Sequence, residues 1–232
     1  MIVGNGLLAK VFHHLYADRS DVTIFAAGVS NSTETDCTAF DREHRLLLEK
    51  LEGPTAKLVY FGSCAVGNPQ EILTPYLAHK AAMESLVVKS GKGVVLRLPQ
   101  VVGRSDNTHT LTNFLYQHII SGEHFTVWSR AERNLIDVED IVAIASFVID
   151  RQLEAHKIVP VAALKSTPMP TIVRTFEEVL GAKANFSRVE KGVPFLIDTS
   201  ITERISHSMQ IDLGDGYLER ILRKYYCPPR SP

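Results

Sequence analysis

Short apolar runs that alternate with amphipathic helical stretches constrain the fold of this chain more than any other feature. The run MIVG at 1–4 ends in glycine, and the ten residues from Leu7 place apolar side chains at helical spacing. The same order recurs along the chain, with strands predicted at 21–28, 57–63, 93–99, 133–137 and 156–164, and helices at 7–16, 37–52, 76–90, 110–122, 138–150, 167–181 and 215–226. This alternation predicts an α/β fold with a mainly parallel sheet covered on both faces.

The length and composition suit one α/β domain with a small appendage. The chain has 232 residues, of which 45% are hydrophobic, so it can bury a full core. We predict a dinucleotide-binding domain at residues 1–150 and a small mixed substrate-binding portion at 151–232, interleaved with 104–130.

The charge balance and the N-terminal sequence exclude several classes of partner. Lys and Arg number 25 against 26 Asp and Glu, with no long basic run, so neither nucleic acid nor an anionic membrane is expected. The start MIVGNGLLAK lacks the features of a signal peptide, and no apolar segment approaches the roughly 20 residues that span a bilayer. We therefore expect a soluble, cytoplasmic protein with a small-molecule partner.

Cysteine and histidine spacing predicts neither disulfides nor a metal site. Cys37, Cys64 and Cys227 are odd in number and far apart, which favours reduced thiols. The nine histidines include no H-E-x-x-H or comparable ligand spacing.

In open parallel sheets, ligands bind beyond the carboxyl ends of the strands. The predicted strands place one group of residues along that edge: Gly4, Ala26 to Ser30, Ser63, Gln100 and Arg104. The first turn, GNGLLA, has the form Gly4-x-Gly6-x-x-Ala9, and glycines there let the backbone approach a pyrophosphate. A tight strand-to-helix turn also favours glycine, so this motif alone fits both a cofactor loop and a structural turn.

The stretch TPYLAHKAAME at 74–84 places an ammonium on an otherwise packed helix stripe. Tyr76 and Lys80 lie four residues apart on one face, and a buried ammonium is costly unless a nearby group uses its charge. Lys80 could reach water or pair with Glu84 one turn on, which is the ordinary structural interpretation. The alternative is that Lys80 belongs to a functional site.

Four separated motifs together resemble the short-chain dehydrogenase/reductase superfamily, in particular its extended branch of NAD-dependent epimerases and dehydratases that modify nucleotide-linked sugars. They are GNGLLA; FAAGVS at 25–30; VYFGSCAVGNP with PYLAHKAAME; and LRLPQVVGR with RNLIDVEDI. The similarity spans residues 1 to 150 and returns at DLGDGYLERILRKYY. It implies a Rossmann-like, doubly wound fold with a small C-terminal substrate-binding portion.

The resemblance implies that Ser63, Tyr76 and Lys80 are catalytic. Tyr76 would exchange a proton with the substrate while a hydride passes to or from nicotinamide, and Ser63 would hydrogen-bond the reacting oxygen. A free tyrosine has a pKa of about 10, and an adjacent ammonium lowers it, so we expect Lys80 to lower the pKa of Tyr76. Thr74 as N-cap and Pro75 at the first helical position would act in the same direction, by placing Tyr76 at the positive end of the helix. Lys80 would also hold the nicotinamide ribose, by similarity to the family.

The cofactor implied is NAD or NADP, and the residues that match the family's cofactor site are Gly4, Gly6, Leu7, Ala26, Ala27, Gly28, Lys80 and Pro99. For a nucleotide-sugar substrate, Arg133 matches the arginine that meets the diphosphate, with an ion pair to Glu132 as the alternative. Gln100 stands where the family has asparagine. Asn113 would line the nucleoside pocket or be an ordinary helix-surface amide. Cys64 would contact substrate, take the position assigned to Ser63, or act as a small buried hydrophobe.

The segment between GNGLLA and FAAG is shorter than the family pattern, which fits two more strands and their helices there. No acidic residue lies in TIFAAG to read a ribose hydroxyl, so NAD and NADP both remain open. A direct right-handed crossover from the first strand to the one at 21–26 would constrain which face the first helix covers, or which neighbour that strand has.

The expected activity is NAD(P)-dependent oxidation or reduction of a keto or hydroxyl carbon on a nucleotide-linked sugar, in polysaccharide or sugar-nucleotide biosynthesis. Dehydration is disfavoured because Cys64, Ala65 and Val66 follow Ser63 where dehydratases place acids. The alternatives are a nucleotide-sugar 4-epimerase, a reductase of a non-sugar carbonyl, and a degenerate non-catalytic nucleotide-binding sensor or partner subunit. Helices 37–52 and 76–90 resemble those of the family's dimer, which predicts a homodimer, although helices packed on their own sheet have the same pattern.

Overall fold

A computed structural model of the chain describes residues 1–54, 57–105, 107–108, 110–151 and 157–227. These residues form two units, each built from two stretches of sequence. The first contains Met1–Leu98 and Val138–Val161, and the second contains Pro99–Asp137 and Ala162–Pro232.

The first unit is built on a five-stranded parallel sheet in the order β1-β2-β3-β4-β9. Its strands are β1 (Ile2–Val3), β2 (Val22–Phe25), β3 (Lys57–Ser63), β4 (Gly93–Leu98) and β9 (Ile158–Pro160). In register, Ile24 of β2 lies between Ile2 of β1 and Val59 of β3. The parallel sheet confirms the α/β, Rossmann-like prediction, and β1 is its edge strand among the described residues.

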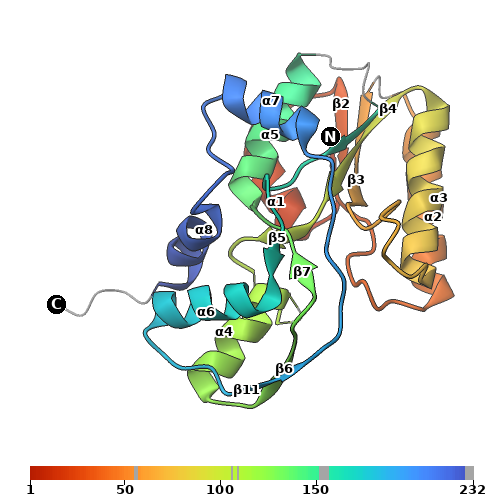
Figure 1. The fold of residues 1–232 in the computed structure, drawn as a ribbon. Helices are drawn as coiled ribbons and strands as arrows, with labels where there is room; N and C mark the ends of the chain where they lie inside the picture. Colours follow the sequence, from red (N-terminus) through yellow and green to blue (C-terminus); the bar gives the residue numbers. More distant parts are fainter. Residues whose placement is uncertain (55–56, 106, 109, 152–156, 228–232) are drawn as a thin grey trace. The chain divides into compact units, whose positions relative to one another are not determined.

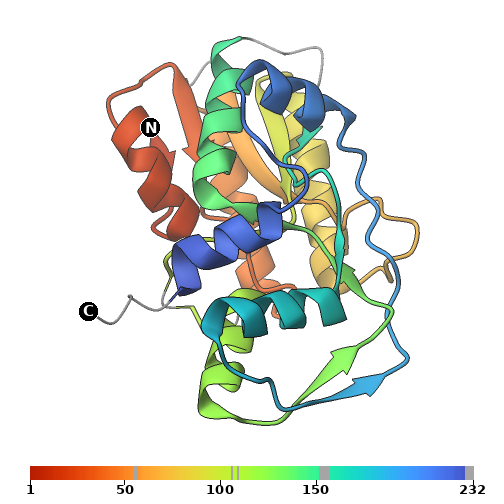
Figure 2. The ribbon, with the colours of Figure 1, turned by 60° about the vertical axis from the view of Figure 1, so that its left-hand side comes forward.

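Helices cover both faces of this sheet (Figure 1): α1 (Leu7–Tyr16) and α5 (Val138–Asp150) on one, α2 (Cys37–Glu52) and α3 (Pro75–Ser90) on the other. Figure 2 shows α1 and α5 side by side, and the Tyr16 hydroxyl donates to Ser146 Oγ at 3.1 Å between them. Neighbouring residues of β3 identify the two faces, because successive side chains of a strand point in opposite directions. The Phe61 ring lies 5.4 Å from that of Phe12 on α1, whereas the Tyr60 hydroxyl bonds to Glu43 on α2.

The face covered by α1 has a topological consequence. The connections β1-α1-β2 and β2-α2-β3 both step to the next strand in the same direction, but their helices lie on opposite faces. Two such crossovers have opposite hands, so one of them departs from the right-handed rule. Residues 17–21 alone join α1 to β2, which leaves no room for the two further strands of the family pattern.

The core on the α2 and α3 face is a continuous apolar cluster of Phe25, Leu47, Leu51, Leu58, Tyr60, Met83, Val87 and Val95. Leu47 and Val87 are fully buried, and removing such a side chain from water contributes about 1.5–3 kcal/mol. This cluster fixes α2 and α3 against the sheet next to the carboxyl end of β3.

The start of α3 confirms the predicted cap. The Thr74 hydroxyl accepts a hydrogen bond from Leu77 N at 3.2 Å, and Pro75 is the first helical residue. The helix ends at Ser90 and is followed by Gly91, whose φ of 70° is left-handed and suits glycine. Tyr76 therefore lies in the first turn.

The second unit contains three two-stranded sheets and four helices among its described residues. The strand pairs are β5 (Gln100–Val102) with β8 (Leu135–Asp137), β6 (Phe125–Trp128) with β11 (Phe186–Val189), and β7 (Glu132–Arg133) with β10 (Thr167–Pro168). The helices are α4 (Leu111–Ser121), α6 (Met169–Leu180), α7 (Ser200–Ser208) and α8 (Tyr217–Tyr226). Asp137 ties α8 to β8, since Lys224 and the Tyr225 hydroxyl each bond to its carboxylate at 2.7 Å.

Every helix predicted from the sequence is present, with ends within two residues of the prediction. Within the described ranges, no helix has the length and apolar character to cross a bilayer.

Candidate active site

The structure places Lys80 in a buried ion pair in the first unit. Its side chain is 4% exposed, and Nζ lies 3.2 Å from Glu43 Oε1 on α2. Lys80 Nζ also donates to the Tyr60 hydroxyl at 3.0 Å. The two ordinary interpretations of Lys80, contact with water or a pair with Glu84, are therefore not what the structure shows.

Glu43 is the centre of this cluster. Its fully buried carboxylate accepts from Val29 N and from the Tyr60 hydroxyl, each at 2.6 Å, and lies 3.0 Å from His79 Nε2. Burial alone would raise the pKa of Glu43, but the charge of Lys80 and the hydrogen bonds outweigh it, so the pKa is lowered. The carboxylate is thus ionised and held by partners from β3, α3 and the loop after β2.

Tyr76 lies beside this pair with a raised pKa. The side chain is 8% exposed, and Lys80 Nζ is 6.0 Å from the centre of its ring. Burial raises the pKa of Tyr76 to about 12, the charge of Glu43 adds to the rise, and hydrogen bonding to Ser63 opposes it. The expectation of a lowered pKa for Tyr76 is wrong here, because burial raises it and the nearby Glu43 carboxylate, which pairs with Lys80, adds to the rise.

Ser63 ends β3 and is held by a second ion pair, which is partly buried. Its backbone N donates to Glu84 Oε1 at 3.4 Å, and two N–H groups of Arg97 donate to Glu84 Oε2 at 3.0 and 2.7 Å. A Cβ on the preceding Gly62 would collide with Glu84. The Ser63 hydroxyl accepts from Ala65 N at 3.2 Å, and its own proton is available for another acceptor, including Tyr76.

Cys64 is turned to the backbone. Its thiol donates to the Arg97 carbonyl at 3.2 Å, and burial raises the pKa of the thiol. The protonated sulfur fills a small buried space, whereas the Ser63 hydroxyl hydrogen-bonds Tyr76.

The glycine turn after β1 brings the backbone of Gly4 against the segment after β2. Gly4 has a φ of +122°, and a Cβ there would collide with the Ala26 carbonyl, so only glycine fits. Gly6 caps α1 without a side-chain hydrogen bond, and nothing lies within 4 Å of where its Cβ would be. Free backbone N–H groups and open space at a helix start are what a pyrophosphate needs.

The segment after β2 connects this turn to the ion pair. Ala26 and Ala27 pack against Gly4, whereas a Cβ on Gly28 would lie 2.7 Å from Lys80 Nζ and 2.9 Å from Glu43 Oε1. Of the predicted cofactor residues, Gly4 thus lies against Ala26 and Ala27, and Gly28 lies against Lys80.

The remaining predicted residues belong to the second unit. Pro99 and Gln100 open it, and Gln100 is exposed at the start of β5. The Asn113 amide donates to the Ser105 and Asn107 carbonyls and accepts from the Tyr226 hydroxyl at 2.6 Å, so this side chain ties α4 to neighbouring segments.

Arg133 lies on β7. It donates to the Glu132 carbonyl at 2.7 Å, and the Glu132 carboxylate instead accepts from Phe195 N at 3.2 Å. The alternative of an ion pair with Glu132 is therefore not seen, and most of the guanidinium donors have no partner among the described residues.

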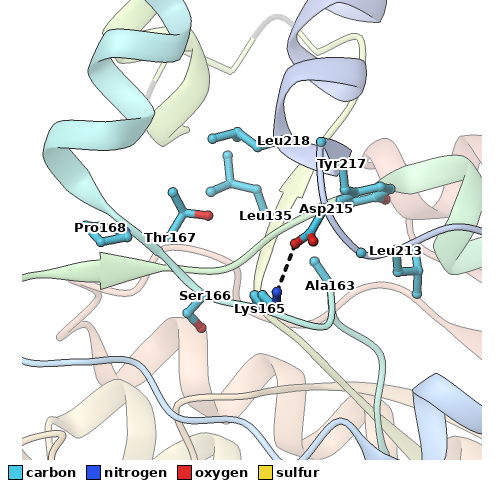
Figure 3. Close-up of a pocket in the computed structure, with 12 residues that line it drawn as sticks. Leu135, Ala163, Lys165, Ser166, Thr167, Pro168, Leu213, Asp215, Tyr217 and Leu218 are labelled. Carbon is cyan, nitrogen blue, oxygen red and sulfur yellow. Dashed lines mark hydrogen bonds and ion pairs between the residues drawn. The ribbon is translucent and has the colours of Figure 1, made fainter.

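A cavity of about 190 Å³ lies within the second unit (Figure 3), lined by the loops at 163–168 and 213–218 together with Leu135. Lys165 and Asp215 form an exposed ion pair at 2.9 Å across it. None of the predicted site residues lines this cavity. The described residues also contain no group of three or more side chains placed to hold a metal.

Sequence reasoning missed Glu43, Tyr60 and His79. The signal for Glu43 was present, because it shares a helical stripe with the buried Leu47 and Leu51. The residues next to Tyr60 in β3 are apolar. Nothing in the sequence therefore distinguishes its hydroxyl from that of an ordinary core tyrosine.

A parallel sheet with helices on both faces and a glycine turn after the first strand defines a Rossmann-like protein. The chain belongs to the NAD dependent epimerase/dehydratase family, whose model matches residues 14–162. No curated protein sequence matches the chain.

Solved structures of this kind share the fold at low sequence identity. The UDP-N-acetylglucosamine 4-epimerase from Methanobrevibacter ruminantium M1 is 18% identical, with a TM-score of 0.69 over 94% of this chain and 78% of that one. The dTDP-glucose 4,6-dehydratase from Bacillus anthracis str. Ames, in complex with NAD, is 15% identical, with a TM-score of 0.68 over 93% and 74%. RMD from Pseudomonas aeruginosa, complexed with NADPH, is 14% identical, with a TM-score of 0.64 over 96% and 87%.

Proposed function

We propose that this protein is an NAD(P)-dependent oxidoreductase that reduces or oxidises a keto or hydroxyl carbon of a nucleotide-linked sugar, in polysaccharide or sugar-nucleotide biosynthesis. The observation that carries the proposal is the gathering of Ser63, Tyr76 and Lys80 around the carboxyl end of β3. The open glycine turn at the neighbouring end of β1 supports it.

NAD(P)H bound along Gly4, Gly6 and the segment 26–28 would supply the hydride. The backbone N–H groups at the start of α1 would hold the pyrophosphate, and Lys80 lies next to Gly28 at the other end of the segment 26–28. The structures of the dehydratase with NAD and of RMD with NADPH favour neither cofactor over the other for this chain.

Tyr76 would deliver the proton that completes a reduction. Because its pKa is about 12, the phenol is protonated at neutral pH and can donate to a carbonyl oxygen as that oxygen gains charge. The Ser63 hydroxyl would bind the same oxygen, since it both donates and accepts. In the second unit, Arg133 and Gln100 would bind the nucleotide sugar, and the free guanidinium donors of Arg133 suit a diphosphate.

Two other functions have support from particular observations. A 4-epimerase needs the same three catalytic side chains, and a UDP-N-acetylglucosamine 4-epimerase is among the structural neighbours. A non-catalytic nucleotide-binding sensor or partner subunit is favoured by β1 at the sheet edge, since no described strand lies beyond it to contact the adenosine.

Cofactor titration together with one substitution separates these functions. We expect NADH or NADPH fluorescence to change on binding, and turnover with a UDP- or dTDP-linked keto sugar to be lost in Tyr76→Phe while cofactor binding persists. Absence of binding to either cofactor would favour the sensor. Inversion of the configuration at C4 of the sugar, without net oxidation, would identify the epimerase.

A further inference from the structure

Glu43 is an unusual residue for the inner face of α2. Its carboxylate has no exposed surface, and burying an ion is unfavourable unless the fold satisfies it. The chain provides four partners, from β3, α3 and the loop after β2. So complete a set of partners shows that the ionised carboxylate is built into the site.

We propose that Glu43 is a positioning residue, which anchors the Lys80 ammonium next to Tyr76 and neutralises it there, so that Tyr76 serves as a proton donor rather than as a proton acceptor. The inference rests on the proposed oxidoreductase function and states the direction of proton transfer to which the site is adapted.

The geometry leaves Lys80 little freedom. Its Nζ donates to both Glu43 Oε1 and the Tyr60 hydroxyl, and that hydroxyl donates in turn to the same Oε1 at 2.6 Å. Gly28 closes the other side, because even a methyl group there would lie 2.7 Å from Nζ. The ammonium is therefore held by two hydrogen-bond acceptors and confined on another side by the Gly28 backbone.

Charged and polar groups surround Tyr76 from every element packed near it. They are Glu43 on α2, Tyr60 and Ser63 on β3, His79, Lys80 and Glu84 on α3, and Arg97 on β4. Arg97 pairs with Glu84, and Lys80 pairs with Glu43. Each ammonium or guanidinium thus has its own carboxylate, and none is left to stabilise a Tyr76 phenolate.

Glu43→Gln tests this arrangement, because it removes the charge and nearly preserves the shape. The readout is the ionisation of Tyr76, followed by tyrosinate absorbance as the difference between each protein and the same protein carrying Tyr76→Phe. Since the pKa of Tyr76 is about 12, the unaltered protein should give little Tyr76 signal below that pH. In Glu43→Gln the midpoint should fall by about one pH unit or more, which is a tenfold change in proton affinity.

Two further variants make the result decisive. Glu43→Asp keeps the charge but moves it back by one methylene, so its midpoint should lie between those of the unaltered protein and Glu43→Gln. If circular dichroism shows that Glu43→Gln does not fold, the midpoint of Glu43→Asp alone decides. Glu49→Gln changes an exposed carboxylate of the same helix and should leave the midpoint unchanged. A midpoint equal to that of the unaltered protein in the Glu43 variants would overturn the proposal.

The titration needs no substrate and no cofactor, so its outcome can be distinguished from that of the turnover test. Lack of turnover with a shifted midpoint would reject the oxidoreductase and keep the role of Glu43. If turnover is found, the pH above which reduction declines should fall with the Tyr76 midpoint in Glu43→Gln, a shift that simple loss of packing would not produce.

Discussion

A methyl group at Gly28 would lie 2.7 Å from Lys80 Nζ and 2.9 Å from Glu43 Oε1. Gly28→Ala should therefore displace the ion pair and destabilise the protein by about 1–3 kcal/mol, as overpacking of a core does. Urea denaturation measures this loss. A variant as stable as the original would show that Lys80 adopts another position at no cost.

Gly6→Ala is the matched control and a prediction in itself. The position has an ordinary φ of −74°, and no atom lies within 4 Å of the added carbon, so the free energy of unfolding should not fall. The methyl group would nevertheless occupy the approach to the start of α1, and we expect weaker NADH or NADPH binding in a fluorescence titration. Unchanged affinity would argue against a pyrophosphate at this turn.

Tyr76→Phe should reduce kcat by about 10²- to 10⁴-fold, the usual contribution of a positioned proton donor. Ser63→Ala should also lower kcat, because it removes a hydrogen bond to the reacting oxygen. Steady-state kinetics with a keto sugar nucleotide provides the measurement. Cys64→Ala, which alters a thiol bound to the Arg97 carbonyl, should leave kcat nearly unchanged; a loss as large as that of Ser63→Ala would reassign the two residues.

Removing one member of the buried Lys80–Glu43 pair should lower the free energy of unfolding more than removing both. Lys80→Met leaves the Glu43 carboxylate without its counter-ion and should cost about 3–5 kcal/mol, whereas Lys80→Met with Glu43→Gln should recover part of that loss. Lys165→Met breaks an ion pair whose side chains are 74% and 89% exposed and should not move the denaturation midpoint. Additive effects of the two buried substitutions would contradict a coupled pair.

The direction of the Tyr76 shift predicts the pH dependence of turnover. A proton donor is active while protonated, and the pKa of Tyr76 is raised to about 12, so kcat for reduction should stay flat from pH 7 to about 10. Oxidation needs the phenolate, and its rate should rise with pH over the same range. An alkaline decline in reduction near pH 8 would show that Tyr76 is more acidic in the working enzyme.

Acid should weaken the fold through Glu43. Its pKa is lowered in the folded protein, so its contribution to stability is present above the unfolded pKa of Glu and is lost as the pH falls toward the folded value. Urea midpoints measured from pH 7 down to about 3, through the unfolded Glu pKa of about 4.3, should decline less steeply in Glu43→Gln. Parallel declines in both proteins would assign acid sensitivity to other carboxylates.

The sequence predicted the helices of both units because their apolar positions recur at helical spacing and their ends carry clear signals, such as Thr74, Pro75 and Gly91 around α3. The short strands β6, β10 and β11 and the helix α7 were not predicted, because two to four residues paired with a distant segment leave no local pattern.

The candidate site was predicted in part, because helical spacing also reveals a charged residue on an apolar helix face. Lys80 was recognised as a charge on an apolar stripe, and the same test applied to 37–52 would have found Glu43. What the sequence could not show is that these two stripes face each other. The wrong expectation for the pKa of Tyr76 follows from the burial of its ring, which is the larger cause, and from that missing contact.

The strand order has a consequence for how the chain acquires its structure. Each of β1 to β4 lies beside its neighbour in the sequence, so these strands can pair as soon as the helix between them forms, without closing a long loop. Only β9 has to return after residues 99–137 have been made, and its docking should be the slow, last step in assembling this half of the protein.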